Sequence, residues 1–257
     1  MKSKWRLEEG KHYVGVCHPI FRFAAPDERH NVVQGCYFDG ETYYVAMVYK
    51  DEKGYETIRI TLYDRQGVIK SASEPLMLDH ANCMTYHPGK DALIVSHCQS
   101  PDKHYNRYSA VDRATLTITE SGDKEAPFFS MAYAPECDRY VSGEWGGETL
   151  DFWDGEMNLI KKRDVEQPKS LSQGVFADGA YCYFVRSSRA GAGAEIRVYD
   201  WEGEMPYRIP LRIEAEIEPE NLNIVNGEAY ILCNTWPKNE TVGIAYRVEL
   251  IEVAKEA

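Results

Sequence analysis

The stretch Gln34-Gly-Cys-Tyr-Phe-Asp-Gly-Glu-Thr-Tyr-Tyr-Val-Ala46 decides the fold, because much of the chain repeats its pattern. It joins a short apolar strand, an Asp-Gly turn and a second apolar strand, which is typical of a β-hairpin. Copies begin near residues 34, 82, 129, 173 and 220, so successive copies lie 44 to 48 residues apart. Such a period indicates an array of one recurring supersecondary unit.

Each repeat continues with a third strand, a recurring turn and a fourth strand. The turn is clearest in Tyr63-Asp-Arg-Gln-Gly67, Trp153-Asp-Gly155 and Tyr199-Asp-Trp-Glu-Gly203. Four strands in about 47 residues are typical of one blade of a β-propeller. We therefore expect an all-β fold: one domain over residues 1–257, built as a five-bladed β-propeller with four-stranded antiparallel blades.

The last repeat is one strand short, because the chain ends after the apolar run at residues 243–253. A surplus strand pattern stands at residues 12–17, before the first repeat. We expect this N-terminal strand to complete the last blade. Ring closure of this kind removes the open edge of the sheet.

Composition limits the partners and the compartment. The chain has 29 Lys and Arg against 41 Asp and Glu, a net charge of -12, which argues against nucleic acid as a partner. No apolar run approaches the roughly 20 residues of a membrane span, and no apolar segment follows the charged N-terminus as in a signal peptide. The seven cysteines form no CxxC pair. We interpret them as reduced thiols and expect a cytoplasmic protein.

Propeller geometry places the start of each first strand and the end of each second strand on the same face. A first ring, at the starts of the first strands, contains Gln34, Asn82, Phe129, Gln173 and Glu220, with His80 and Asn221 beside it. A second ring, at the ends of the second strands, contains Met47, His97, Glu144, Arg186 and Asn234, followed by loops that carry His104, Trp145 and Trp236.

Polar groups beside aromatic residues in a concavity are typical of a ligand site. The predicted ligand-binding residues are Gln34, His80, Asn82, His97, Trp145, Gln173, Arg186, Asn221, Asn234 and Trp236. Alternatively, these polar side chains hold ordered water and loop amides in a wet channel.

Two carboxyl groups are candidates for acid–base chemistry, Glu144 and Glu220. A buried carboxyl near apolar or like-charged neighbours has a raised pKa and can act as a general acid. Two acids with stacking tryptophans, here Trp145 and Trp236, also resemble the arrangement in glycosidases. Alternatively, each carboxylate only accepts hydrogen bonds from backbone amides in a loop.

A divalent metal near His80, His97 and Glu144, with His104, is a weaker hypothesis. These histidines come mainly from one repeat and lack HxH or HExxH spacing. A solitary histidine at a loop end is more often a hydrogen-bonded structural residue. We therefore expect no metal and no other cofactor.

At the repeats, the chain resembles small bacterial five-bladed propellers of the glutaminyl cyclotransferase type. The resemblance rests on Val33-Gln-Gly35 with Asp39-Gly40 and Tyr43-Tyr44, and on Ser172-Gln-Gly174 with Asp178-Gly179. It implies a catalytic Glu at the end of the second strand, but the matching stretch Tyr44–Tyr49 contains no acid. The resemblance therefore implies the fold and not the reaction.

Two functions of different classes follow. The first is binding of a small polar ligand, a saccharide or an amino-acid derivative, at the channel mouth. The second is an enzyme at the same site, a hydrolase, lyase or cyclotransferase with Glu144 or Glu220 as acid or base. A scaffold that presents its rim to a protein partner is a third option.

Overall fold

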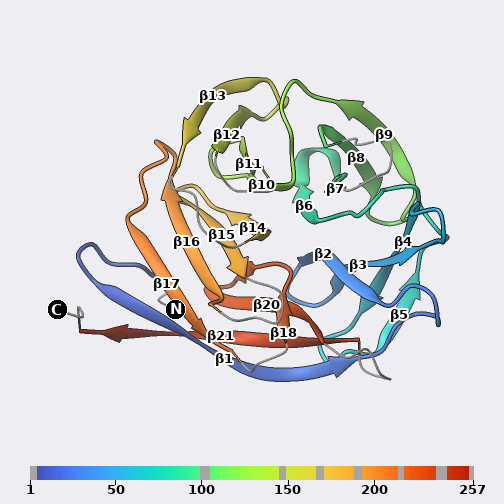
Figure 1. Cartoon of the computed structure of the whole chain (residues 1–257), viewed down its shortest axis with the longest axis horizontal. Coiled ribbons are helices and arrows are strands. Elements are labelled where there is room, and N and C mark those ends of the chain that lie inside the picture. The colour runs from blue at the N-terminus through green and yellow to red at the C-terminus, as the bar shows by residue number, and fades with distance from the viewer. Residues whose placement is uncertain are drawn as a thin grey trace.

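The computed structural model describes residues 5–98, 105–144, 149–165, 171–187, 193–213, 217–235 and 242–254. These residues form an all-β structure, as predicted (Figure 1). The one helical element within the described ranges is a single 3-10 turn, η1 (Pro88–Lys90).

Three sheets are four-stranded and antiparallel, with their strands in chain order. Sheet 1 contains β2 (Val32–Phe38), β3 (Tyr43–Lys50), β4 (Glu56–Tyr63) and β5 (Ile69–Ala72). Sheet 2 contains β6 (Cys83–His87), β7 (Ala92–Ser96), β8 (Arg107–Asp112) and β9 (Ile118–Asp123). Sheet 3 contains β10 (Ser130–Ala134), β11 (Arg139–Gly143), β12 (Thr149–Asp154) and β13 (Leu159–Asp164).

The remaining strands form one large mixed sheet of nine strands. Its first part contains β14 (Leu171–Ala177), β15 (Tyr181–Ser187), β16 (Glu195–Asp200) and β17 (Tyr207–Arg212). Its second part contains β18 (Ile217–Pro219), β19 (Asn223–Val225), β20 (Glu228–Thr235), β21 (Gly243–Val253) and β1 (His12–Phe23). Residues 12–17 pair with β21, as expected from the sequence, and the strand continues to Phe23.

The fourth and fifth repeats therefore do not form two separate sheets. Strand β1 pairs with β21 in antiparallel orientation and with β17 in parallel orientation. The parallel pairing consists of two residue pairs, Gly15 with Leu211 and Val16 with Arg212. This short contact joins the last two repeats into one sheet.

The recurring turns are built by their aspartates. The Asp64 carboxylate accepts hydrogen bonds from the backbone N–H of Gln66 and Val68, both at 2.9 Å. Asp154 and Asp200 make the same pair of bonds in their turns. A short carboxylate side chain that bonds its own backbone in this way stabilises a turn without tertiary help.

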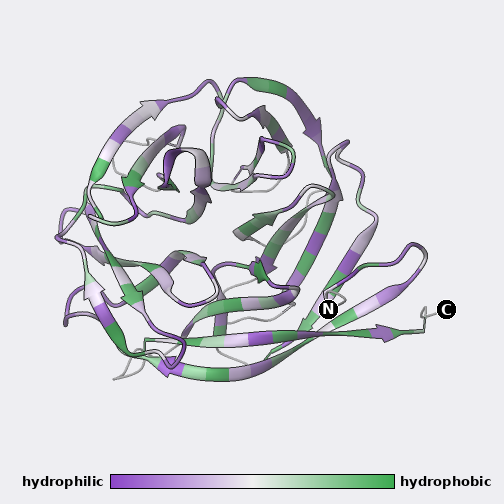
Figure 2. Ribbon diagram, turned by 180° about the vertical axis from the view of Figure 1, so that it is seen from behind, coloured by the Kyte–Doolittle hydropathy of each residue, from purple (hydrophilic) through white to green (hydrophobic). Residues whose placement is uncertain are grey.

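The core lies between successive sheets. Ile60 of sheet 1 and Val95 of sheet 2 belong to one buried cluster, and Ile94 of sheet 2 and Trp153 of sheet 3 belong to the next. Strands β7 and β10 are buried at every residue, because neighbouring sheets cover both of their faces. Figure 2 shows both hydrophobic and hydrophilic stretches along the strands. The first strands β2, β6, β10 and β14 lie nearest the middle of the molecule, and β5, β9 and β13 lie at its periphery (Figure 1).

Candidate functional site

The predicted first ring lies at the starts of the inner strands, and its side chains are buried. Asn82 Nδ2 donates to the backbone carbonyls of Phe129, at 2.8 Å, and of Gln173, at 3.1 Å. Asn82 therefore links sheet 2 to sheet 3 and to the large sheet. Gln34 is also buried, and its Oε1 has no hydrogen-bond partner within the described residues.

Four predicted residues meet around the start of the fifth repeat. Asn234 Nδ2 donates to the carboxylate of Glu220, and Gln173 Nε2 donates to Glu218 Oε1 at 2.9 Å. Asn221 Oδ1 accepts from the Leu232 N–H at 3.1 Å. The structure thus brings Gln173, Glu220, Asn221 and Asn234 together, around Glu218, which the sequence analysis missed.

The Glu220 carboxylate contributes to the raised pKa of a thiol on each of two sheets. Burial is the main cause that raises the pKa of Cys83 to about 12, and Glu220 raises it further. Burial also raises the pKa of Cys233, again with a contribution from Glu220. Glu220 is therefore a carboxylate of the molecule's interior, close to both β6 and β20.

Gly174 permits this assembly. A Cβ at Gly174 would lie 2.2 Å from the Asn221 Cα and 2.7 Å from the Glu220 carbonyl oxygen. Because both atoms belong to the backbone, no side-chain rotation would relieve the clash. The Gln-Gly pair of the sequence therefore serves the close approach of two inner strands.

The two predicted histidines within the described residues, His80 and His97, each contact a carboxylate. His80 Nδ1 lies 2.8 Å from Oε2 of the buried Glu56, and Lys50 Nζ lies 3.4 Å from Glu56 Oε1. His97 Nδ1 lies 3.0 Å from Asp79 Oδ2, and its Nε2 lies 2.9 Å from Ser109 Oγ. Within the described ranges, no group of three or more His, Cys, Asp or Glu is placed to hold a metal ion.

The loop that carries His80 has an unusual backbone. Asp79 and Ala81 both have positive φ, 49° and 48°, a conformation that is costly for residues other than glycine. The Ala81 carbonyl accepts the Gly35 N–H at 2.9 Å. The strained loop thereby fixes both the start of β6 and its contact with β2.

Glu144 lies after β11, near a carboxyl that the sequence analysis missed. Asp151 on β12 is completely buried, and neither of its oxygens has a hydrogen-bond partner among the described residues. Lys162 Nζ lies 3.7 Å from Asp151 Oδ1. Burial raises the pKa of Asp151 to about 6, and Glu144 contributes to the rise against the opposing effect of Lys162. The other predicted acid, Glu220, instead contacts Asn234.

Arg186 belongs to a cluster of cationic side chains, in which Arg186 and Arg197 are buried and Arg208 is exposed. The Arg186 side chain is only 2% exposed, and burial together with the charge of Arg197 lowers its pKa to about 10. Arg197 Nε donates to Glu195 Oε1 at 2.7 Å, and Arg208 donates to the other oxygen of Glu195. The arginine cluster, defined as Arg186, Glu195, Arg197 and Arg208, thus combines three guanidinium groups with one carboxylate.

The missed residues occupy one equivalent position of the third strand. In register, Thr61 faces Val45, Ser109 faces Val95, Asp151 faces Ser142, and Arg197 faces Phe184. All four are buried. A polar residue three positions before the aspartate of the recurring turn is the signal that could have found them.

Three predicted residues lie outside the described residues: His104, Trp145 and Trp236. The predicted stacking surface therefore remains a prediction.

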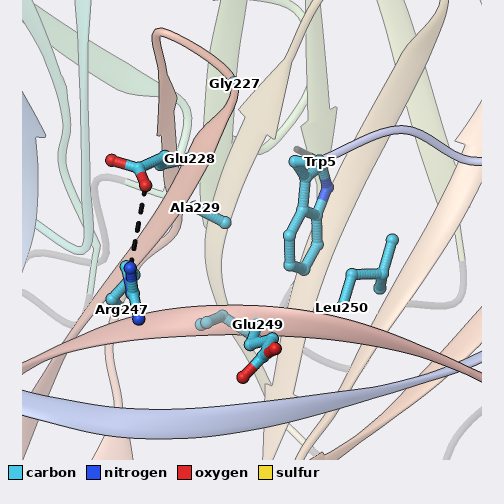
Figure 3. A pocket seen from close by; sticks show the side chains of 8 residues that line it. Trp5, Gly227, Glu228, Ala229, Arg247, Glu249 and Leu250 are labelled. Carbon is cyan, nitrogen blue, oxygen red and sulfur yellow. Dashed lines mark ion pairs between the residues drawn. The ribbon is translucent and has the colours of Figure 1, made fainter. Parts of the chain in front are cut away.

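Of the pockets that lie away from these residues, two differ clearly in position. One is on the molecular axis, at the hairpin ends of the inner strands. The other lies at the side, where Trp5 stands near strand β21, which carries Arg247 and Glu249 (Figure 3). Arg247 pairs with Glu228 there, at 3.8 Å between Nη1 and Oε1. This lateral pocket is lined by Trp5 of the N-terminal segment, by β20 and the turn before it, and by β21.

No family model and no curated protein sequence matches the chain. Among solved structures, it is similar to the tail fiber of Staphylococcus aureus phage P68, with a TM-score of 0.63 and 12% identity over 91% of this chain and 53% of the other. Matches to Kuenenia stuttgartiensis hydrazine synthase and to U3-55K have TM-scores of 0.45 and 0.48, with 15% and 12% identity. They cover 92% and 83% of this chain, and 63% and 61% of those chains.

The chain therefore spans between about half and two thirds of the length of these structures. At this identity, the likeness to the tail fiber shows a shared fold and nothing about activity. No helix within the described ranges is long and apolar enough to cross a membrane.

Proposed function

We propose that the chain is a five-bladed β-propeller. Sheets 1 to 3 supply three blades, and β14–β17 supply the fourth. Strands β18 to β21 with β1 supply the fifth, so that the N-terminal strand closes the ring. The support is the recurring strand order together with the brevity of the parallel contact, two residue pairs, that joins the last two units.

We further propose that this propeller binds a small polar ligand at the face where the inner strands begin. The observation that carries the proposal is the arginine cluster. Arg186 and Arg197 are buried side by side, and the charge of Arg197 contributes to the lowered pKa of Arg186. Glu195 is shared between Arg197 and Arg208. An anionic group bound there would relieve the repulsion, and guanidinium groups suit carboxylates because of their paired donors.

The opposite charge lies at the start of the fifth repeat. Glu218 and Glu220 place two carboxylates two positions apart in the chain. Gln173 of β14 donates a hydrogen bond to Glu218, and Asn234 donates one to Glu220. Because Gln173 and Arg186 belong to the same hairpin, acidic and basic groups flank one part of the face. A zwitterionic amino-acid derivative would supply both complementary charges. A neutral saccharide would supply neither, so the amino-acid derivative is the better candidate.

The test is a thermal-shift and calorimetric comparison of four probe classes: free α-amino acids, their carboxamides, their N-acetyl derivatives and neutral monosaccharides. Free amino acids should bind most tightly, and carboxamides should bind at least tenfold more weakly. Arg186→Met should abolish this preference. Arg163→Met, a surface arginine on β13 paired with Glu204, is the matched control and should leave binding unchanged. Equal binding of acids and carboxamides would refute the proposal.

An enzyme at this face is the second candidate, and Asp151 favours it. A buried carboxyl with a pKa of about 6, near Glu144, is suited to exchange protons near neutral pH. On this alternative, a bound ligand would be hydrolysed, eliminated or cyclised with Asp151 or Glu144 as acid or base. Mass spectrometry of the ligand after prolonged incubation decides: turnover that Asp151→Asn removes while binding persists indicates an enzyme, and an unchanged ligand indicates a binding protein.

A further inference from the structure

A pocket of about 330 Å³ lies on the axis, at the face opposite to the first ring. It is lined from five strands: β2, β6, β10, β14 and β19. Its outer edge contains turn residues that follow these strands, such as Asp39, Pro88 and Pro135. The pocket is thus a product of the whole repeat and not of one hairpin.

The floor of the pocket is apolar. It consists of Met84, Val175 and Leu222, which are 5%, 6% and 2% exposed. Each lies two positions after a residue of the first ring, namely Asn82, Gln173 and Glu220. Because a strand advances about 3.3 Å per residue, this apolar layer is only about 7 Å from the polar ring. This layer lies between the pocket and the polar ring, so the pocket opens at the other end of the inner strands from the face proposed above to bind ligand.

The walls are aromatic and held in place. Tyr37 and Tyr86 are stacked, with ring centroids 5.2 Å apart and planes inclined by 24°. The Tyr86 hydroxyl donates to Asp91 at 2.7 Å, and the Tyr133 hydroxyl donates to Asp138 at 2.7 Å. Phe176 completes the aromatic lining. Fixed aromatic faces attract cations through their negative π-surface.

The protein itself places a cation on this wall. The guanidinium of Arg113 lies 5.1 Å from the centroid of the Tyr86 ring, 3.0 Å from Asp91 and 3.8 Å from Asp39. The rim also carries Glu136. Burial and the nearby Asp39 raise the pKa of Tyr37 to about 12, so this phenol is neutral and adds no charge of its own. The pocket mouth therefore combines aromatic faces with carboxylates.

From this combination we propose that the axial pocket is a second binding site, for a small organic cation with an aromatic or aliphatic body. The body would rest on Met84, Val175 and Leu222, and the ammonium group would lie at the rim, near Glu136 and the tyrosine rings. The volume is at the low end for small-molecule sites, which favours a single small molecule over a peptide. The net charge of -12 attracts such a cation from a distance.

Three probes of similar shape test the proposal: 2-phenylethylamine, 2-phenylethanol and 3-phenylpropionate, measured by ligand-observed NMR and calorimetry. The amine should bind at least tenfold more tightly than the acid, with the alcohol between them. Two variants address the site. Ile224→Trp fills the mouth from a partly exposed position and should abolish binding, and Glu136→Lys reverses a rim charge and should weaken amine binding at least fivefold.

Glu125→Lys makes the same charge change at an exposed position outside the pocket lining and should have no comparable effect. Arg186→Met should leave amine binding intact, which separates this site from the proposed amino-acid site. Equal binding of the three probes, absence of binding, or full amine binding by Glu136→Lys would overturn the proposal. Because Glu136 is exposed, that variant stays informative even where Ile224→Trp fails to fold.

Discussion

The Asn234 side chain makes two hydrogen bonds with the backbone of Val33, a residue 201 positions away in the chain. Its Nδ2 donates to the Val33 carbonyl, and its Oδ1 accepts the Val33 N–H, both at 2.8 Å. These two bonds resemble the paired N–H and C=O bonds between adjacent antiparallel strands, except that a side chain makes them. It joins β20 to β2, and so connects the fifth repeat to the first where a closed ring needs a contact.

Loss of these two hydrogen bonds should destabilise the protein. Asn234→Ala leaves a buried N–H and a buried C=O of Val33 without their partner, and also removes the donor to Glu220. We expect a loss of about 2–4 kcal/mol in the free energy of unfolding, measured by urea denaturation. Asn31→Ala, which removes only an exposed bond to the Glu28 carbonyl, should cost less than about 0.5 kcal/mol. Similar losses in the two variants would contradict the role given to Asn234.

Gly174→Ala should disturb the first ring. The added Cβ would meet the backbone of Asn221 and Glu220, so the strands must move apart. We expect destabilisation of about 3 kcal/mol or more, seen as a lower Tm. Gly89→Ala is the control, because the nearest atom to its Cβ is a His87 side-chain atom at 3.1 Å, which can shift. A Gly174→Ala protein with unchanged Tm would show that the inner strands do not approach as described.

Glu195 should contribute strongly to the free energy of unfolding, because its carboxylate pairs with two arginines at once. Glu195→Gln removes the one carboxylate of the arginine cluster and leaves Arg197 buried without that charge partner. We expect a cost of about 3–5 kcal/mol, and a smaller cost when Arg197→Met is added to the same protein. A double-mutant cycle measures the coupling. Strictly additive effects would mean that the two side chains do not act as a pair.

Asp151 should make stability fall as pH rises. Its pKa is raised to about 6 from the usual 3.8, so the folded protein holds this proton more tightly than the unfolded chain does. The contribution is complete below about pH 4 and lost as pH rises through about 6. Asp151→Asn should therefore be more stable than the wild type at pH 8, by roughly 3 kcal/mol at most, and similar to it near pH 4.

Denaturation curves of both proteins at the two pH values measure this difference. Asp154→Asn serves as the comparison, since hydrogen bonds from the Asn158 and Glu156 amides lower the pKa of Asp154. That variant should gain no stability at pH 8. A wild-type protein that is as stable as Asp151→Asn at pH 8 would contradict a buried, destabilising carboxylate.

Much of the fold could be predicted because the deciding signals are local. Asp64 and Gly67 mark a turn through bonds that the turn makes with itself, and the same turn recurs at Asp200. The parallel contact of β1 with β17 could not be predicted, because two residue pairs about 200 positions apart leave no pattern in either strand. This contact joins the fourth and fifth repeats into one sheet, where we expected two.

The candidate site was less predictable for a related reason. The position of Asn82 and Gln173 on the inner strands could be predicted, but not that Asn82 bonds two backbone carbonyls. Asp151 and Arg197 were missed because their chemistry depends on their burial and on charged neighbours, Lys162 for the first and Glu195 for the second. The burial that raises the pKa of Asp151, and that lowers the pKa of Arg186 next to Arg197, is a property of tertiary packing.

The central claim is that the arginine cluster receives an anionic group of a small ligand. The most direct measurement is a crystal structure of the wild-type protein soaked in a mixture of free α-amino acids. We expect five blades about one axis and a carboxylate within hydrogen-bond distance of the Arg186 guanidinium. A structure in which Arg186 still contacts only protein atoms after soaking would contradict it.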